Sequence, residues 1–75
     1  MVEREVYIQD PESAAAFATC VQRHHYEADL ECEHTRVDAG SLVGILAKCI
    51  EKKVRLVVYN LETGEELDEV LKQWY

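Results

Sequence analysis

Apolar and polar residues follow each other along the chain with two periods, and together they predict seven secondary-structure elements. A period of two, typical of a half-buried strand, runs from Ala28 to His34, and segments of β-forming residues precede and follow it. A spacing of three and four residues, typical of a helix with one buried side, occurs in two further segments. The expected strands are residues 5–9, 28–34, 36–39 and 54–59, and the expected helices begin near Pro11, Ser41 and Thr63.

Residues that satisfy free backbone groups mark the start of each expected helix. Asp10 is suited to cap the first helix, with Pro11 at its first position, and Ser41 fits the N-cap of the second. Residues 63–66 fit a capping box for the third helix. The buried stripes expected on the first and third helices consist of Phe17, Cys20, Val21 and His24, and of Leu67, Val70, Leu71 and Trp74.

The order β-α-β-β-α-β-α predicts an α+β fold, in which three helices cover one face of a four-stranded antiparallel sheet. A chain of 75 residues makes a single domain, residues 1–75, with one core. The turn near residues 33–35 lacks the usual Asn-Gly signal, so the pattern leaves the register of that hairpin open. The side chains expected to be largely buried are Phe17, Val21, Leu46, Val57, Leu67 and Leu71.

The charge balance argues against several classes of partner. The chain has 8 basic and 15 acidic residues and a formal net charge of −7. Phosphate contacts need a surface rich in Lys and Arg, so neither nucleic acid nor an anionic membrane is an expected partner. No apolar run approaches the ~18–20 residues that span a bilayer, and residues 1–5 lack the apolar core of a signal peptide. We therefore expect a cytoplasmic protein.

The cysteines and histidines do not form a pattern typical of a metal or redox site. The three cysteines are widely spaced and flanked by apolar residues, so we expect reduced thiols in or near the core. Adjacent histidines on a helix point about 100° apart, and no His pair four residues apart exists. Neither a metal nor a cofactor is expected. The residues considered are Cys20, Cys32, Cys49, His24, His25 and His34.

The acidic residues of the last helix are expected to be solvated rather than catalytic. They fall on its outer face, whereas general acid–base chemistry needs one poised group in a cleft. They are Glu62, Glu65, Glu66, Asp68 and Glu69. The sequence has neither a Gly-rich phosphate loop nor a nucleophile–base pair, so it assigns no catalytic residue.

Three segments together resemble the HPr phosphocarriers of the bacterial sugar phosphotransferase system. Residues Glu5 to Ile8 are similar to the first strand of that family, and residues 30–41 lie where the family has a hairpin that leads into a helix. The motif Ser41-Leu42-Val43-Gly44 is similar to the Ser-Ile-Met-Gly of the family. The order of elements agrees over nearly the whole chain. The resemblance implies an HPr-like open-faced sandwich and a carrier-type protein rather than an enzyme.

The phosphoryl-accepting motif of that family is missing. In the family, a Gly-Leu-His-Ala/Thr-Arg-Pro loop at the start of the first helix supplies the histidine that takes the phosphoryl group. An alignment from the first strand puts Ala15 in place of the histidine and Phe17 in place of the arginine, and an alignment from Val21 puts Ser13 at the histidine. We interpret Ser13 as an ordinary first-turn residue. The expected result is an HPr-like protein that lacks phosphoryl transfer.

The second expected helix carries the remaining candidate sites. The resemblance places a regulatory serine phosphorylation site at Ser41, and an ordinary N-cap is the alternative. Leu42, Val43 and Leu46 match residues with which the family docks partner proteins. Because the helix is apolar almost all round, its surplus apolar side is expected to bury against a protein partner or a second copy. The docking residues considered are Leu42, Val43, Leu46, Ala47 and Ile50.

Two functions remain open on these grounds. The first is a non-catalytic regulatory or protein-binding module related to the phosphocarriers. The second is a structural or self-associating small domain that shares only the fold with them, since a fold does not fix a function.

Overall fold

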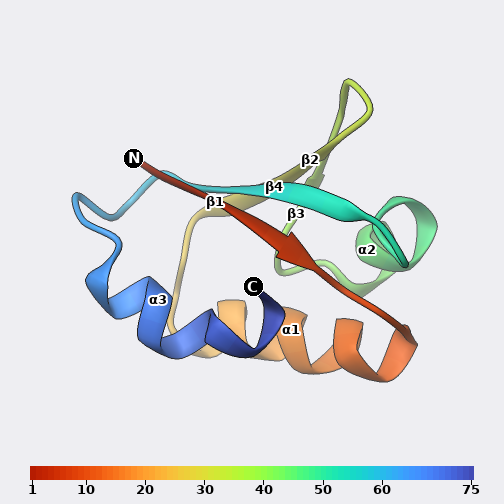
Figure 1. Ribbon diagram of the computed structural model, residues 1–75, viewed down its shortest axis with the longest axis horizontal. Helices are drawn as coiled ribbons and strands as arrows, with labels where there is room; N and C mark the ends of the chain where they lie inside the picture. The colour runs from red at the N-terminus through yellow and green to blue at the C-terminus, as the bar shows by residue number, and fades with distance from the viewer.

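A four-stranded antiparallel sheet and three α-helices make up the computed structural model, which describes residues 1–75 (Figure 1). The predicted order of elements is confirmed, and the bounds of the elements move by a few residues. The elements are β1 (Val2–Tyr7), α1 (Pro11–Arg23), β2 (Ala28–Cys32), β3 (Thr35–Asp38), α2 (Leu42–Lys48), β4 (Lys53–Val58), α3 (Glu65–Leu71) and the 3₁₀ helix η1 (Lys72–Trp74).

The strands lie in the order β1-β4-β2-β3, so the first and third strands of the chain form the two edges. Helices α1 and α3 lie side by side beneath the sheet, and α2 lies at its end (Figure 1). A short parallel bridge between Ile8 and Ile50 joins the segments that follow β1 and α2. The sheet therefore has one covered face and one open face.

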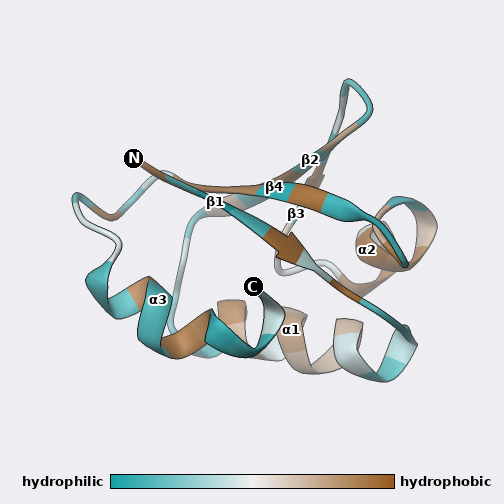
Figure 2. Ribbon diagram, in the orientation of Figure 1, coloured by the Kyte–Doolittle hydropathy of each residue, from teal (hydrophilic) through white to brown (hydrophobic).

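The core lies between the sheet and the helices and consists of apolar side chains only. Inward positions of the strands alternate with charged ones, and Figure 2 shows the apolar segments of β1, β4 and α3 among polar neighbours. Five of the side chains expected to be buried are buried, namely Phe17, Val21, Val57, Leu67 and Leu71. The prediction for Leu46 is wrong, because this side chain is 43 % exposed.

The buried face of α1 differs from the predicted stripe. Phe17 and Val21 are buried as expected, but Cys20 is half-buried and His24 is exposed. Their places are taken by Ala14 and Ala18, whose small side chains let the helix lie close to its neighbours. The pattern of bulky residues therefore misplaced the centre of the buried face by part of a turn.

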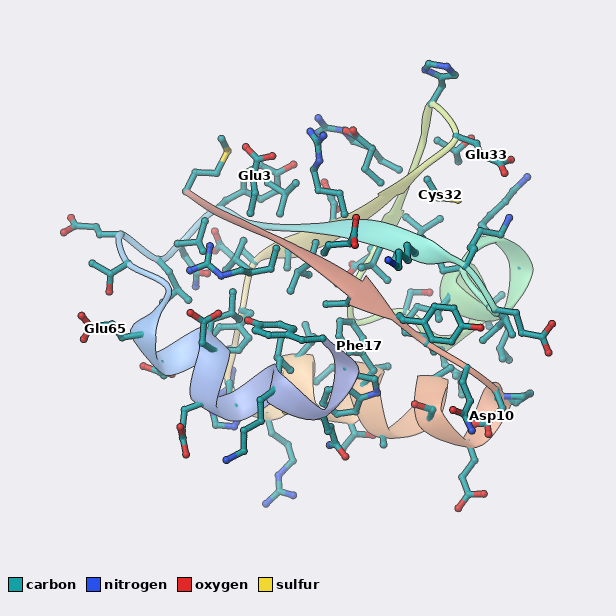
Figure 3. All side chains as sticks on the ribbon, in the orientation of Figure 1. Glu3, Asp10, Phe17, Cys32, Glu33 and Glu65 are labelled. Carbon is teal, nitrogen blue, oxygen red and sulfur yellow. The ribbon has the colours of Figure 1, made fainter.

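The open face of the sheet is covered by paired charges. Arg36 Nη2 lies 2.9 Å from Glu31 Oε2, and Arg55 Nη1 lies 3.3 Å from Glu3 Oε1. Figure 3 shows Glu3 on this face and Phe17 on the opposite, helix-covered side. Val57 is buried but lies outside the core cluster, because its position in β4 points it to the open face. The open face of the sheet thus carries mostly charged side chains, and the covered face carries mostly apolar ones.

Three turns hold residues other than glycine at positive φ. Glu33 and His34 have φ of 49° and 68° and form a two-residue connection between the paired residues Cys32 and Thr35. Positive φ at both positions is the geometry of a type I′ turn, which fixes the hairpin register that the sequence left open. The other two cases are His25, with a φ of 56°, directly after α1, and Glu51, with a φ of 60°, between α2 and β4.

The end of α1 is a Schellman motif. The backbone N–H of His25 donates to the carbonyl of Gln22, and that of Tyr26 donates to the carbonyl of Val21. These two bonds satisfy carbonyls that the helix end leaves free, and they require the left-handed conformation at His25.

The predicted capping box of the third helix is wrong. Gly64 is the N-cap of α3, and no side chain caps the helix. A Cβ atom at Gly64 would lie 1.9 Å from Arg4 Nη2, so the absence of a side chain makes room for this guanidinium. Arg4 in turn donates to Asp68 on α3, with a distance of 2.7 Å from Nε to Oδ1. The glycine is used here for close packing of β1 against α3.

Candidate functional site

Helix α2 carries an exposed apolar surface. Its N-cap is Ser41, whose hydroxyl accepts a hydrogen bond from the backbone N–H of Gly44 at 3.2 Å. Within the helix only Ile45 is buried. The side chains of Leu42, Val43 and Leu46 are 38 %, 79 % and 43 % exposed.

This exposure follows from the length and position of α2. The helix has seven residues and packs against α1 and β3, and a Cβ atom at Gly44 would lie only 3.2 Å from Cβ of Val37 in β3. The close approach turns Ile45 inward and leaves the other sides of the helix in solvent. Ile50 belongs to the inner side, since it is half-buried and packs against the core. We call the four exposed apolar residues of α2 the α2 patch: Leu42, Val43, Leu46 and Ala47.

The N-terminus of α1 is where the sequence resemblance places phosphoryl chemistry. Here the side chain of Asp10 accepts a hydrogen bond of 2.7 Å from the backbone N–H of Ser13. Glu12 adds a second carboxylate in the first turn. The protein's own acidic groups therefore occupy the positive end of the helix, where an anion would otherwise bind.

No histidine lies near this helix end. His24 and His25 follow the last turn of α1, which has 13 residues and is therefore about 20 Å long. His34 is at the tip of the β2–β3 hairpin. None of the three is placed to take over a site near Asp10.

The other residues aligned with the phosphoryl motif have structural roles. The hydroxyl of Ser13 accepts a hydrogen bond of 2.9 Å from Nε1 of Trp74, so its interpretation as a first-turn residue agrees with its contacts. Phe17 is fully buried and meets Trp74 edge-to-face, with ring centroids 5.1 Å apart. Ala15 is half-buried on the outer side of α1.

Two of the five acidic residues near the last helix do more than face solvent, which corrects the sequence interpretation. Asp68 accepts from Arg4 and from the hydroxyl of Tyr75, and these hydrogen bonds hold the pKa of the Asp68 carboxyl below its usual value. Glu66 accepts a hydrogen bond of 3.0 Å from the hydroxyl of Tyr26. Burial, together with this bond to Glu66, raises the pKa of Tyr26 to about 12. These groups fasten α3 to β1 and to the end of α1.

The three cysteines are free thiols. Cys32 and Cys49 are buried and Cys20 is half-buried, so they lie in or near the core as predicted. No group of three or more His, Cys, Asp or Glu side chains converges on one point. None of the helices is long and apolar enough to cross a membrane.

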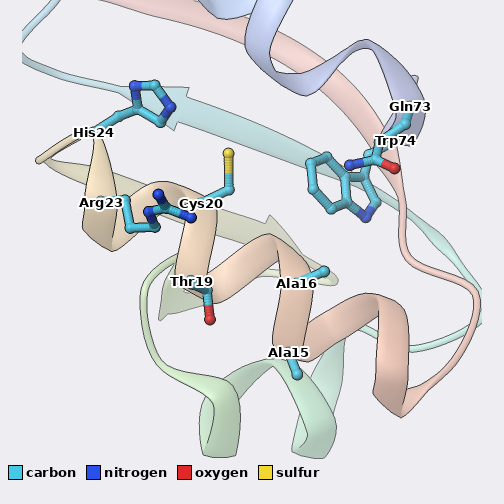
Figure 4. Close-up of a pocket in the computed structure, with 8 residues that line it drawn as sticks. All are labelled: Ala15, Ala16, Thr19, Cys20, Arg23, His24, Gln73 and Trp74. Atoms are coloured by element: carbon cyan, nitrogen blue, oxygen red, sulfur yellow. The ribbon is translucent and has the colours of Figure 1, made fainter.

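A groove that the sequence analysis did not identify runs between α1 and η1 (Figure 4). It has a volume of about 580 Å³. It exists because the outer side of α1 carries small side chains opposite the end of the chain. Its lining residues are Ala15, Ala16, Thr19, Cys20, Arg23, His24, Gln73 and Trp74. Sequence periodicity reports on buried faces, so it gives no signal for a groove lined by small and polar residues.

Comparison with known proteins identifies the fold. Neither a protein-family model nor a curated protein matches the chain. Among solved structures, HPr-C-His from Thermoanaerobacter tengcongensis superposes with a TM-score of 0.76 and 21 % identity, over 97 % of this chain and 89 % of that one. The phosphocarrier protein HPr from Bacillus anthracis str. Ames gives a TM-score of 0.74 and 20 % identity, over 99 % and 96 %. The chain therefore has the HPr-like fold, with its sheet and three helices in the order that the sequence predicts.

Proposed function

We propose that this chain is a non-catalytic, cytoplasmic protein-binding module of the HPr type, which docks a partner protein through the α2 patch and carries no phosphoryl group. The observation that supports docking most strongly is the exposure of Leu42, Val43 and Leu46 on one short helix. Exposed apolar patches of this kind mark sites of protein interaction.

The size of the patch suits a transient complex. Full burial of a large aliphatic side chain contributes about 1.5–3 kcal/mol, and less where part of the side chain is already covered. Three such residues contribute several kcal/mol, which supports weak binding once the cost of association is subtracted. A partner protein is favoured over a second copy, because two copies with a net charge of −7 each repel one another.

We infer the loss of phosphoryl transfer from the residues at the N-terminus of α1. Asp10 and Glu12 place negative charge at the point where an incoming phosphoryl group would need positive charge. No histidine or arginine occurs between Ile8 and Arg23 to replace the family's motif. A role in binding without transfer is consistent with both observations.

Regulation at Ser41 is part of the proposal. Ser41 immediately precedes Leu42 and Val43, so a phosphate there would add about −1.5 to −2 charges at the edge of the α2 patch. We expect an HPr kinase to modify the wild type and to leave Ser41→Ala unmodified. Phosphate on another residue, or none on the wild type, contradicts this part of the proposal.

The docking surface is tested with Val43→Asp and the bacterial Enzyme I as the probe protein. Titration calorimetry is expected to show binding to the wild type and at least tenfold weaker binding to the variant. Gln9→Ala, an exposed change outside α2, is the matched control and should bind like the wild type. Sedimentation of the wild type tests the alternative: a dimer that Val43→Asp dissociates would favour self-association over a partner protein.

A further inference from the structure

The groove between α1 and η1 differs in charge from the rest of the surface. None of the 15 acidic residues of the chain lines it. Arg23 lies along its wall (Figure 4), and it is the one arginine without a carboxylate partner. An unpaired guanidinium in a chain with a net charge of −7 is a local attraction for an anion.

One wall of the groove is apolar and fixed in place. Trp74 is only 4 % exposed, and its indole is held by the edge-to-face contact with Phe17 and by the hydrogen bond to Ser13. Ala15 and Ala16 lie opposite, and their small side chains leave the space open. Since so little of Trp74 is exposed, a flat apolar group entering here would rest mainly on the alanines of α1 and would meet only the exposed part of the indole, which is already held in place.

The polar groups of the groove are free to bind a ligand. The side chains of Thr19, Gln73 and Arg23 have no partner among the side-chain hydrogen bonds of the structure, whereas Gln22 and Trp74 beside them do. Burial raises the pKa of the Cys20 thiol, so this group is neutral at pH 7 and does not offset the charge of Arg23. The groove therefore brings together a cation, free hydrogen-bonding groups and an apolar wall.

We propose that this groove binds a small organic anion, with its phosphate or carboxylate group on the guanidinium of Arg23 and a flat apolar body against the alanines of α1, beside the exposed part of Trp74. Guanidinium pairs with either anion through two parallel hydrogen bonds. The groove, about 580 Å³ in volume, is open to solvent, so it has room for a ligand of this size and leaves part of that ligand exposed. The groove lies on α1 and η1 and does not include the α2 patch, so the inference stands apart from the proposed function.

The single tryptophan of the chain, Trp74, reports directly on occupancy of the groove. Titration with phenyl phosphate is expected to change its fluorescence with saturation, at a Kd on the order of 1 mM for a ligand of this size in an open groove. Phenylacetate tests the carboxylate form of the same chemistry. Inorganic phosphate and benzyl alcohol, which each lack one half of the ligand, should bind at least tenfold more weakly.

Two variants separate the charge from the space. Arg23→Gln should weaken phenyl phosphate binding at least tenfold, because it removes the charge-assisted pair. Ala16→Leu keeps the charge but fills the groove, and it should also reduce binding. Lys48→Gln removes the one lysine without a carboxylate partner, which lies on α2, and should leave binding unchanged.

Any of three results would overturn the inference. They are the lack of a saturable fluorescence change with either anion, binding of benzyl alcohol as tight as that of phenyl phosphate, and wild-type affinity for phenyl phosphate in Arg23→Gln. All three substituted side chains are exposed, and circular dichroism melting of each variant verifies that the fold is retained.

Discussion

Replacement of Val43 by aspartate should leave the stability of the domain unchanged, although valine to aspartate is a drastic change. The side chain of Val43 is 79 % exposed, so little burial is lost. Valine and aspartate have similar helix propensities. Position 43 is the second residue of α2, where a carboxylate gains about 0.3–1 kcal/mol from the helix dipole. These terms place the change in the free energy of unfolding within about 0.5 kcal/mol of zero.

The matched comparison is Ile45→Ala, two residues further along the same helix. Ile45 is fully buried, so this truncation should cost about 2–5 kcal/mol. A domain of 75 residues has a total stability of roughly 4–11 kcal/mol, so the loss is a large part of the whole. Urea unfolding followed by circular dichroism measures both variants under the same conditions.

The contrast between the two variants tests the orientation of α2. A loss of more than about 1.5 kcal/mol in Val43→Asp would mean that Val43 is packed in the core, because surface changes rarely cost that much. The α2 patch would then lose its main residue. An Ile45→Ala variant as stable as the wild type would refute the inward direction assigned to this helix face.

Three further changes test other parts of the structure. His25→Gly should stabilise the domain by about 0.5–1 kcal/mol. Glycine removes the strain of the left-handed conformation, although its larger loss of conformational entropy on folding offsets part of that gain. A lower urea midpoint would contradict the Schellman motif. Glu33→Asn combined with His34→Gly should raise the melting temperature for the same reason, because Asn-Gly is the preferred type I′ pair, and a lower melting temperature would refute that turn. The stabilisation from Asp68 is present above its unfolded pKa and is lost as the pH falls through its lowered folded pKa. The stability difference between wild type and Asp68→Asn should therefore shrink below about pH 4, and a difference that grows there would refute the pairing of Asp68 with Arg4.

The order of elements was predictable because each element has one apolar side in its sequence. The strand alternation of Leu30 and Cys32 and the helical spacing of Leu67 and Leu71 both correspond to buried faces. Closing such elements around one core leaves few arrangements. The spacing of apolar residues was therefore enough to predict the fold.

Positions that depend on how closely two elements approach were not predictable from the pattern. Leu46 looks like a core residue, but Gly44 brings α2 so near β3 that the helix turns Ile45 inward instead. Gly64 displaces the expected cap because Arg4 passes beside it. The burial of a residue such as Leu46 and the N-cap of α3 depend on contacts between segments that are distant in sequence. The spacing of apolar residues within one segment carries no information on those contacts.

Of the two candidate sites, one was predictable from the sequence and the other was not. The apolar character of α2 was visible in the sequence, and the structure adds which side of it is exposed. The groove beside Trp74 was not visible, because its residues come from both ends of the chain and have no common pattern. Residues that meet only in space leave no trace in a single sequence.

The most direct test of the account is incubation of the protein with Enzyme I and phosphoenolpyruvate, followed by mass spectrometry under conditions that preserve acid-labile phosphate. An HPr phosphocarrier run in parallel verifies that the enzyme is active. We predict no added phosphate on this chain, because acidic groups cap the N-terminus of α1 and no histidine lies there. A stoichiometric phosphohistidine at His24, His25 or His34 would contradict the account.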